Sequence, residues 1–209
     1  MSNEFNSCFI SYKHPVEMNS RETVLIQHVY RAITDHIQLY THAPVFFDAS
    51  RLMPGYVWRS ALSLELCRSA CMVVVYWPSY LESDYCKKEI STMVAIEKNR
   101  RKILGDRLSA RRLIIPVILR GRHDQLPPIL QGVQHLDYSA QASRPDFNIG
   151  DDNEMSKKLF EIADYIHSLC AIMREEGEGL FGECKKFTMH DVKRDDPRFM
   201  METQKFPGR

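Results

Sequence analysis

The stretch that decides the fold is ACMVVVYWPSYLESDYCKKEI, residues 70–90. It opens with the continuously apolar run at 70–77, which is typical of a β-strand covered on both faces of a sheet. After a polar turn, Ser83 or Asp84 is placed to cap a helix. The apolar stripe of that helix consists of Ile90, Met93 and Val94. The stretch therefore predicts a buried strand, a turn and an amphipathic helix.

On either side of this stretch, short apolar runs alternate with segments of helical periodicity. Four further strands are expected, at 7–12, 43–48, 111–119 and 134–139. Further helices are expected at 21–37, at 58–69 and in a closing segment that Asp151 and Glu154 cap. This alternation predicts an α/β fold with a five-stranded parallel sheet and helices on both faces. Pro116 further predicts that its strand lies towards an edge of the sheet or contains a bulge.

Folds of this kind bind ligands beyond the carboxyl ends of their strands. Tyr12, Lys13 and His14 stand at the end of the first strand, and they exclude a phospho-receiver domain, which needs an acidic cluster there. The loop 48–57 follows the second strand, and the segment 78–89 follows the third. Three stretches that are distant in sequence therefore converge on one rim, where we expect a site.

Composition excludes several classes of protein. The formal net charge of +1 argues against a nucleic-acid partner, because nucleic-acid binding normally leaves a domain clearly basic. The start MSNEFNS is polar and acidic, unlike a secretion signal. The apolar run at 70–77 is far shorter than the roughly 20 residues of a membrane helix. We therefore expect a soluble, cytoplasmic protein that does not bind membranes.

The cysteines are scattered along the chain without a CxxC pair. They are Cys8, Cys67, Cys71, Cys86, Cys170 and Cys184. No cysteine–histidine spacing is typical of a metal site, so we expect no bound metal. Cys8 and Cys71 lie in apolar strand-like runs, where a buried thiol acts as a small hydrophobic side chain. We interpret all six cysteines as reduced, and none as catalytic.

The chain changes character near its C-terminus. From residue 174 onward it becomes polar and loses its periodicity. We therefore expect one domain at 1–173 and a polar C-terminal extension at 174–209. Scattered apolar side chains favour docking of this extension over a flexible tail. These are Leu180, Phe181, Phe187 and Phe199.

Several segments, taken in order, resemble the Toll/interleukin-1 receptor (TIR) domain. CFISYKH at 8–14 resembles its opening strand, and VFFDASRLMPGYVW at 45–58 resembles its second strand and BB loop. CMVVVYWPSYLESDYCKKEI at 71–90 resembles its third strand and the helix with an aromatic-x-x-x-Glu pattern. RLIIPVIL, LPPIL and HLDY match the usual end of the domain. The resemblance covers roughly residues 6–170 and implies the flavodoxin-like TIR fold.

TIR domains are of two functional kinds, scaffolds that only assemble and enzymes that cleave NAD+. The enzymes carry a glutamate at the position that Glu89 matches, so the resemblance implies that Glu89 is catalytic. The aromatic residue one turn earlier is often tryptophan, and in this chain it is Tyr85. Met53 stands where some enzymatic relatives have an acidic residue.

A single carboxylate suffices for this chemistry. Nicotinamide is cationic while it is bonded to the ribose, so its departure needs no general acid, unlike that of ordinary glycosides. The remaining oxocarbenium-like ribose is stabilised by a nearby negative charge. Tyr85 and Glu89 are four positions apart and share one face of the helix. An aromatic plane and a carboxylate therefore point to the same side.

The substrate-binding candidates are Tyr12, Lys13, Asp48, Arg51 and Tyr85. Lys13 and Arg51 supply positive charge for the pyrophosphate of NAD+. Asp48 ends the second strand, where fixing the loop is the alternative role. Glu65 is a competing carboxylate that we interpret as a surface or structural residue, and Trp58 as core packing. No cofactor is expected, because NAD+ is the substrate.

The product is open to three outcomes. Water captures the oxocarbenium to give ADP-ribose, a nucleophile of the same molecule gives a cyclic ADP-ribose isomer, and another nucleophile gives base exchange. Resemblance to bacterial antiviral TIR proteins, such as those of the Thoeris kind, implies a role in anti-phage defence with a separately encoded sensor or effector.

The resemblance also implies TIR–TIR self-association. The alternative to an enzyme is a non-catalytic adaptor that assembles through the loop 48–57. A nucleoside deoxyribosyltransferase-like enzyme, with a similar fold and related sugar chemistry, is a further option.

Overall fold

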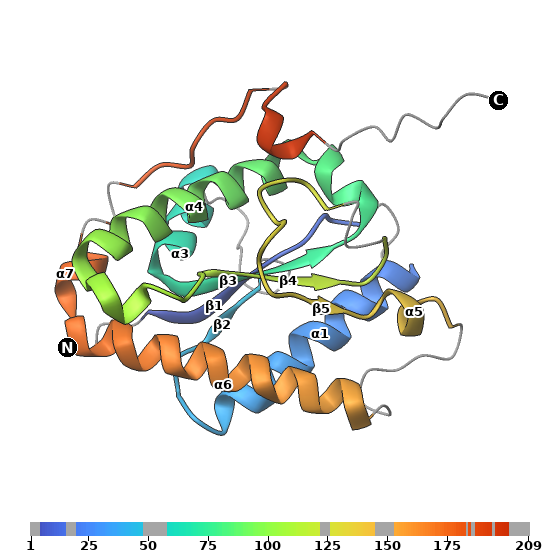
Figure 1. Cartoon of the computed structure of the whole chain (residues 1–209), viewed down its shortest axis with the longest axis horizontal. Helices are drawn as coiled ribbons and strands as arrows, with labels where there is room; N and C mark the ends of the chain where they lie inside the picture. Colours follow the sequence, from blue (N-terminus) through green and yellow to red (C-terminus); the bar gives the residue numbers. More distant parts are fainter. Residues whose placement is uncertain are drawn as a thin grey trace.

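The computed structural model describes residues 5–15, 20–47, 58–121, 126–144, 153–182, 184, 187–193 and 195–200. Its centre is a five-stranded sheet of order β2-β1-β3-β4-β5, in which all neighbouring strands are parallel (Figure 1). The strands are β1 (Asn6–Ser11), β2 (Val45–Phe46), β3 (Ser69–Tyr76), β4 (Ile114–Ile118) and β5 (Leu136–Asp137). The predicted α/β fold class with a five-stranded parallel sheet is confirmed.

Within the described ranges, four helices of more than ten residues cover the two faces of this sheet (Figure 1). On one face α1 (Arg21–Gln38) packs against α6 (Asn153–Glu176), and on the other α3 (Trp58–Arg68) packs against α4 (Asp84–Leu104). The short elements are η1 (Pro78–Glu82), η2 (Gly105–Leu108), α5 (Ser139–Ala142), α7 (Glu178–Phe181) and η6 (Pro197–Phe199). Among the described helices, none is both long and apolar enough to cross a membrane.

The core is centred on β3, in which every residue is buried. This burial confirms the interpretation of the apolar run as a strand covered on both faces. The predicted helix stripes also face the core. In α1 the buried stripe includes Ile26, Val29, Ile33 and Ile37, and in α6 it includes Leu159, Ile162, Ala163, Ile166, Cys170 and Met173. Hydrophobic burial on both faces therefore holds the layers together.

The outer strands are shorter than the sequence predicts, because each has only one neighbour. β2 and β5 contain two residues each, against predicted spans of 43–48 and 134–139. Pro116 lies in β4, one strand in from the edge. The amide of Leu119 donates to the carbonyl of Tyr76 in β3. Backbone groups alternate in direction along a strand, so the backbone nitrogen of Pro116 faces β5 rather than β3. The pairing with β5 begins only at Val117, so no ladder bond is missing at Pro116.

The start of α4 agrees with its sequence signals. The side chain of Ser83 accepts a hydrogen bond from the amide of Cys86, which makes Ser83 the N-cap. The helix ends at Gly105, whose φ of 53° is a left-handed conformation that favours glycine. Asp151, the predicted cap of the closing helix, lies outside the described residues.

One prediction about the cysteines is wrong. Cys67 and Cys184 form a disulfide, with their Cα atoms 5.5 Å apart and a separation of 117 positions in the sequence. The sequence contains no local signal for this pair, because the fold alone brings the end of α3 and the C-terminal segment together. The other cysteines are buried and form no disulfide: Cys8, Cys71, Cys86 and Cys170.

Candidate functional site

The candidate site lies where β1 and β3 end, next to the first turns of α4. In the order β2-β1-β3-β4-β5 the chain runs outward in one direction to β2 and in the other to β4 and β5. The gap between β1 and β3 is therefore the topological switch point, where open parallel sheets bind their ligands. Ser11 is the last residue of β1, and Glu89 lies in the second turn of α4.

Three buried side chains meet at this point. The Oγ atom of Ser11 donates a hydrogen bond to Oε2 of Glu89 at 2.5 Å. The same Oγ atom lies 2.5 Å from the hydroxyl of Tyr80, which comes from η1. The exposed fractions of the three residues are 1% for Ser11, 0% for Tyr80 and 6% for Glu89. The fold thus holds the Glu89 carboxylate in one orientation.

The direction of these bonds follows from the protons available. The hydroxyl of Ser11 has one hydrogen, and it donates this hydrogen to Glu89, so Tyr80 donates to Ser11. Burial, together with the neighbouring Cys86 and the charge of Glu89, raises the pKa of Tyr80 well above its usual value. Tyr80 therefore keeps its proton, and a chain of donors runs from Tyr80 through Ser11 to Glu89.

The predicted binding residues that the structure describes lie near the donors Tyr80 and Ser11 or near Glu89, and their environments differ. Tyr12 is buried, and its ring stacks on Phe47 at a centroid distance of 4.9 Å. Lys13 forms an ion pair with Glu82 at 2.6 Å. Tyr85, one turn before Glu89, is exposed. Asp48 and Arg51 lie outside the described residues.

Glu89 is not among the lining residues of the grooves that the structure describes. A groove of about 450 Å³ lies elsewhere, between β4, β5 and α6, and its lining includes Arg112, Leu136, Lys158 and Tyr165. The loop 48–57, which the sequence places beside Glu89, belongs to the part of the chain that is not described. Within the described ranges, no group of three or more His, Cys, Asp or Glu side chains has the arrangement of a metal site.

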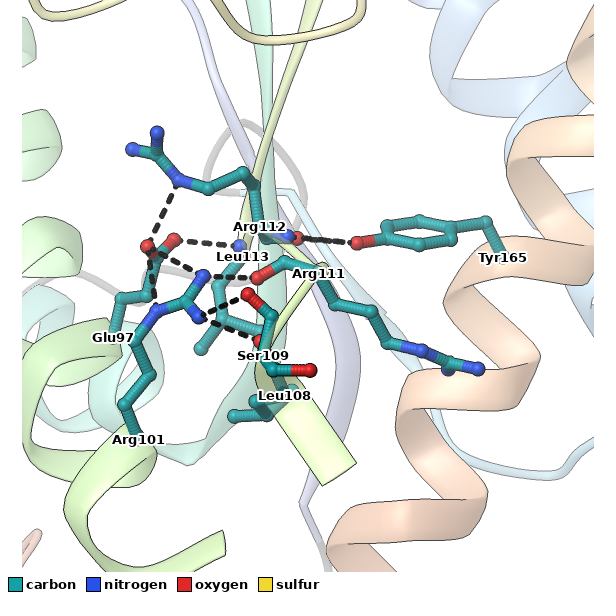
Figure 2. Close-up of polar contacts among 8 residues, drawn as sticks. All are labelled: Glu97, Arg101, Leu108, Ser109, Arg111, Arg112, Leu113 and Tyr165. Carbon is teal, nitrogen blue, oxygen red and sulfur yellow. Dashed lines mark hydrogen bonds and ion pairs between the residues drawn. The ribbon is translucent and has the colours of Figure 1, made fainter. Parts of the chain in front are cut away.

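A second buried carboxylate, Glu97, lies two turns further along α4 and forms a different kind of network (Figure 2). Its Oε2 atom accepts a hydrogen bond from the amide of Leu113 at 2.7 Å. Its Oε1 atom lies 3.2 Å from the guanidinium of Arg101 and 2.9 Å from that of Arg112. The hydroxyl of Tyr165 in α6 accepts a hydrogen bond from the amide of Arg112 and donates one to its carbonyl oxygen. Glu97 therefore joins α4 to the start of β4 and has a structural role.

Sequence reasoning missed Ser11, Tyr80 and Glu97. Tyr80 lies in the segment 78–89 that the sequence places at the rim, and Ser11 lies within the predicted first strand, but neither residue type carries a distinctive pattern there. Glu97 and Arg101 have the i, i+4 spacing of a helical ion pair, which was the available signal. Glu65, in agreement with its structural interpretation, accepts a hydrogen bond from Asn6 at 2.8 Å.

Comparisons with known proteins identify the domain. The family model described as TIR domain matches residues 8–149, which is more than half of the chain. No curated protein matches the chain. Among solved structures, the TIR domains of the activated Roq1 resistosome, which directly recognizes the pathogen effector XopQ, are similar at 17% identity. The match covers 87% of this chain and 95% of that chain, with a TM-score of 0.44.

Proposed function

The chain belongs to the TIR domain family, and from this premise we propose that it cleaves the nicotinamide–ribose bond of NAD+ with Glu89 as its catalytic carboxylate. The observation that carries the proposal is the position of Glu89. It lies at the switch point of the sheet, one hydrogen bond from the end of β1. Ligands of open parallel sheets bind at this point.

The chemistry requires little more than a fixed negative charge. Loss of neutral nicotinamide leaves positive charge on the ribose, and a preoriented carboxylate stabilises that charge without reorganising. Ser11 supplies the preorientation, because its hydroxyl donates to one oxygen of Glu89 and is itself held by the hydroxyl of Tyr80. Tyr85 offers an exposed aromatic ring on the same helix, and Lys13 offers a cation for the pyrophosphate.

Access to Glu89 sets a condition on activity. The side chain is only 6% exposed, so a ribose reaches it only after the surroundings rearrange. We propose that self-association of TIR domains brings this about, with the loop 48–57 of one copy completing the pocket of its neighbour. Turnover then depends on protein concentration, and an isolated copy has low activity.

The proposed products are ADP-ribose or a cyclic ADP-ribose isomer. A signal-producing role in bacterial anti-phage defence, in the cytoplasm and with a separately encoded sensor or effector, is the corresponding biological proposal. A water-filled pocket favours hydrolysis, whereas a pocket that folds the adenine back onto the ribose favours cyclisation.

A non-catalytic adaptor is the second candidate, and one observation favours it. A carboxylate that is almost fully buried and bonded to a serine is also typical of a structural residue. In that case the chain works by TIR–TIR assembly alone, and Glu89 only ties α4 to β1.

Purified protein incubated with NAD+ separates the two candidates. Release of nicotinamide, measured by chromatography over a hundredfold range of protein concentration, supports the enzyme, and a rise in activity per molecule supports activation by assembly. Comparison of the sugar-containing product with ADP-ribose and cyclic standards identifies the branch. Complete retention of NAD+ at every concentration, by folded protein that does self-associate, supports the adaptor.

A further inference from the structure

The C-terminal strap, which we define as the described residues between 178 and 200, lies along the outer side of α4. Figure 1 shows it in orange and red, running from α7 past the end of α4 towards its beginning. The strap is docked rather than free, because Leu180, Cys184 and Phe199 are buried. It therefore forms an additional layer over the helix that carries Glu89.

The first anchor of the strap is a disulfide beside an aromatic stack. Cys184 bonds to Cys67 at the end of α3. The carbonyl oxygen of Cys67 accepts a hydrogen bond from Arg100 at 2.7 Å. The guanidinium of Arg100 also lies 5.1 Å from the ring of Phe181, which stacks on Phe5 at 5.1 Å. Covalent and non-covalent contacts thus hold the strap at the same point.

Beyond this anchor the contacts with α4 are few. The amide of His190 donates to Oγ1 of Thr92 at 2.9 Å. Lys88 forms an ion pair with Asp191 at 2.8 Å, but the Asp191 side chain is 85% exposed, and water weakens such a pair. These two contacts lie on either side of Glu89 in the sequence of α4. The strap therefore meets the helix at the level of the candidate site.

The far end of the strap has its own anchor. The amide of Ile129 donates to the carbonyl of Arg198 at 3.2 Å, and Phe199 is buried. Between the two anchors, Phe187, Met189 and Val192 are only partly buried against the core. Docking of the middle of the strap on α4 therefore depends on the anchors at its two ends. The disulfide keeps this middle part close to α4 and so raises its effective concentration at the docking site.

We propose that the Cys67–Cys184 disulfide is a redox latch that keeps the strap docked on α4, and that a dithiol reductant opens it. The reductant has one target, because Cys67–Cys184 is the disulfide among the described cysteines and the other four are already thiols. Opening leaves the sheet intact and exposes the outer side of α4. The inference does not depend on cleavage of NAD+.

The redox step is a thiol–disulfide exchange. A thiolate of the reductant attacks Sγ of Cys67, the less deeply buried of the two residues, and expels the Cys184 thiolate. The second thiol of the reductant then closes the reductant's own disulfide and releases the Cys67 thiolate. Both thiolates take up protons, so two electrons and two protons pass from the dithiol to the protein.

Hydrogen–deuterium exchange of the full chain, with and without dithiothreitol, tests the latch. We expect amides at 187–193 to exchange at least tenfold faster after reduction, while β1 and β3 remain protected. Peptide mapping under non-reducing conditions verifies the bridge in the untreated protein. Equal exchange in the two states, or a mapped chain with six free thiols after mild oxidation, overturns the proposal.

The matched control is the variant Cys184→Ala. Its strap should exchange rapidly from the start, and dithiothreitol should have no further effect. If the variant does not fold, the comparison of the oxidised and reduced parent decides alone. A dithiol effect of equal size in folded Cys184→Ala would assign the change to another cysteine and overturn the latch.

Discussion

Ser11 and Glu89 are separated by 78 positions in the sequence, and the hydroxyl of Ser11 donates to the Glu89 carboxylate at 2.5 Å. One residue ends β1, and the other belongs to the second turn of α4. The bond therefore forms only when the switch point of the sheet is assembled. It makes the orientation of the carboxylate a property of the fold, which is the condition for electrostatic stabilisation without reorganisation.

Replacement of this carboxylate by an amide tests its proposed role. Glu89→Gln keeps the shape and an oxygen for Ser11 but removes the charge that stabilises the ribose. We expect turnover of NAD+ to fall by about a thousandfold, which corresponds to about 4 kcal/mol. Nicotinamide release measures the turnover, and thermal unfolding measures the fold, whose Tm should change by less than about 4 °C.

Glu154→Gln is the matched control for this variant, because Glu154 is an exposed residue of α6 that pairs with Lys158. Its turnover should equal that of the parent. A Glu89→Gln protein that consumes NAD+ at the parent rate would remove Glu89 from the mechanism.

The bond between Ser11 and Glu89 gives a second prediction. Ser11→Ala leaves the carboxylate in place but removes the donor that fixes it, and a bond to a charged group contributes about 1.5–3 kcal/mol. We expect kcat to fall by roughly tenfold to hundredfold, with little change in KM. Steady-state kinetics on NAD+ provide both constants.

Another buried serine serves as the control. Ser63 donates to the carbonyl of Ser60 within α3, so Ser63→Ala changes a buried hydroxyl away from Glu89. An equal loss of kcat in both variants would mean that the effect of Ser11 comes from general destabilisation. Tyr80→Phe removes the hydroxyl that donates to Ser11. We expect it to lower kcat as Ser11→Ala does, but by a smaller factor.

The sequence predicted the fold well where burial is continuous. The run at 70–77 has no polar residue to suggest a solvent face, and β3 is buried throughout. At the edges the prediction of length was poor, because strand ends depend on neighbours. β5 pairs only through Leu136 and Asp137, and their pairing with β4 is not visible in local composition.

The site was predictable only as far as chain order allows. The rim position of Tyr12, Lys13 and Glu89 followed from the alternation of strands and helices. The hydrogen bonds from Tyr80 through Ser11 to Glu89 could not be predicted. They join three elements, and residues of these types occur at many other positions of the sequence. The disulfide between Cys67 and Cys184 was missed for the same reason.

The Glu97 network yields a prediction about stability. Glu97→Gln removes the charge shared by Arg101 and Arg112, although the amide of Leu113 keeps an acceptor. The arginine side chains are 30% and 40% exposed, and solvent screening reduces the loss below that of a fully buried pair. We expect the free energy of unfolding to fall by about 1–3 kcal/mol, measured by urea denaturation.

Two observations separate this role from a catalytic one. Glu161→Gln, which changes an exposed carboxylate of α6, should leave the unfolding free energy within about 0.5 kcal/mol of the parent. Turnover per folded molecule should be unchanged in Glu97→Gln. A stable Glu97→Gln protein with strongly reduced turnover would contradict the assignment of Glu97 to structure alone.

Native alkylation provides a prediction about the cysteines. The thiolate is the reactive form, so a raised pKa lowers the fraction that reacts at a given pH. Burial is the main cause that raises the pKa of Cys170 to about 12, and burial also raises the pKa of Cys71 well above its usual value. At pH 8 both are therefore almost fully protonated as well as sealed from the reagent. We expect the oxidised native protein to gain no carbamidomethyl groups in iodoacetamide.

The number of adducts then reports which cysteines become accessible. Native protein treated with dithiothreitol should gain two groups, and peptide mapping should place them on Cys67 and Cys184. Unfolded, reduced protein should gain six, one for each cysteine of the chain. Adducts on Cys71 or Cys170 in the native oxidised state would show that the core opens on the timescale of labelling. The sheet around β3 would then be less tightly closed than its complete burial indicates.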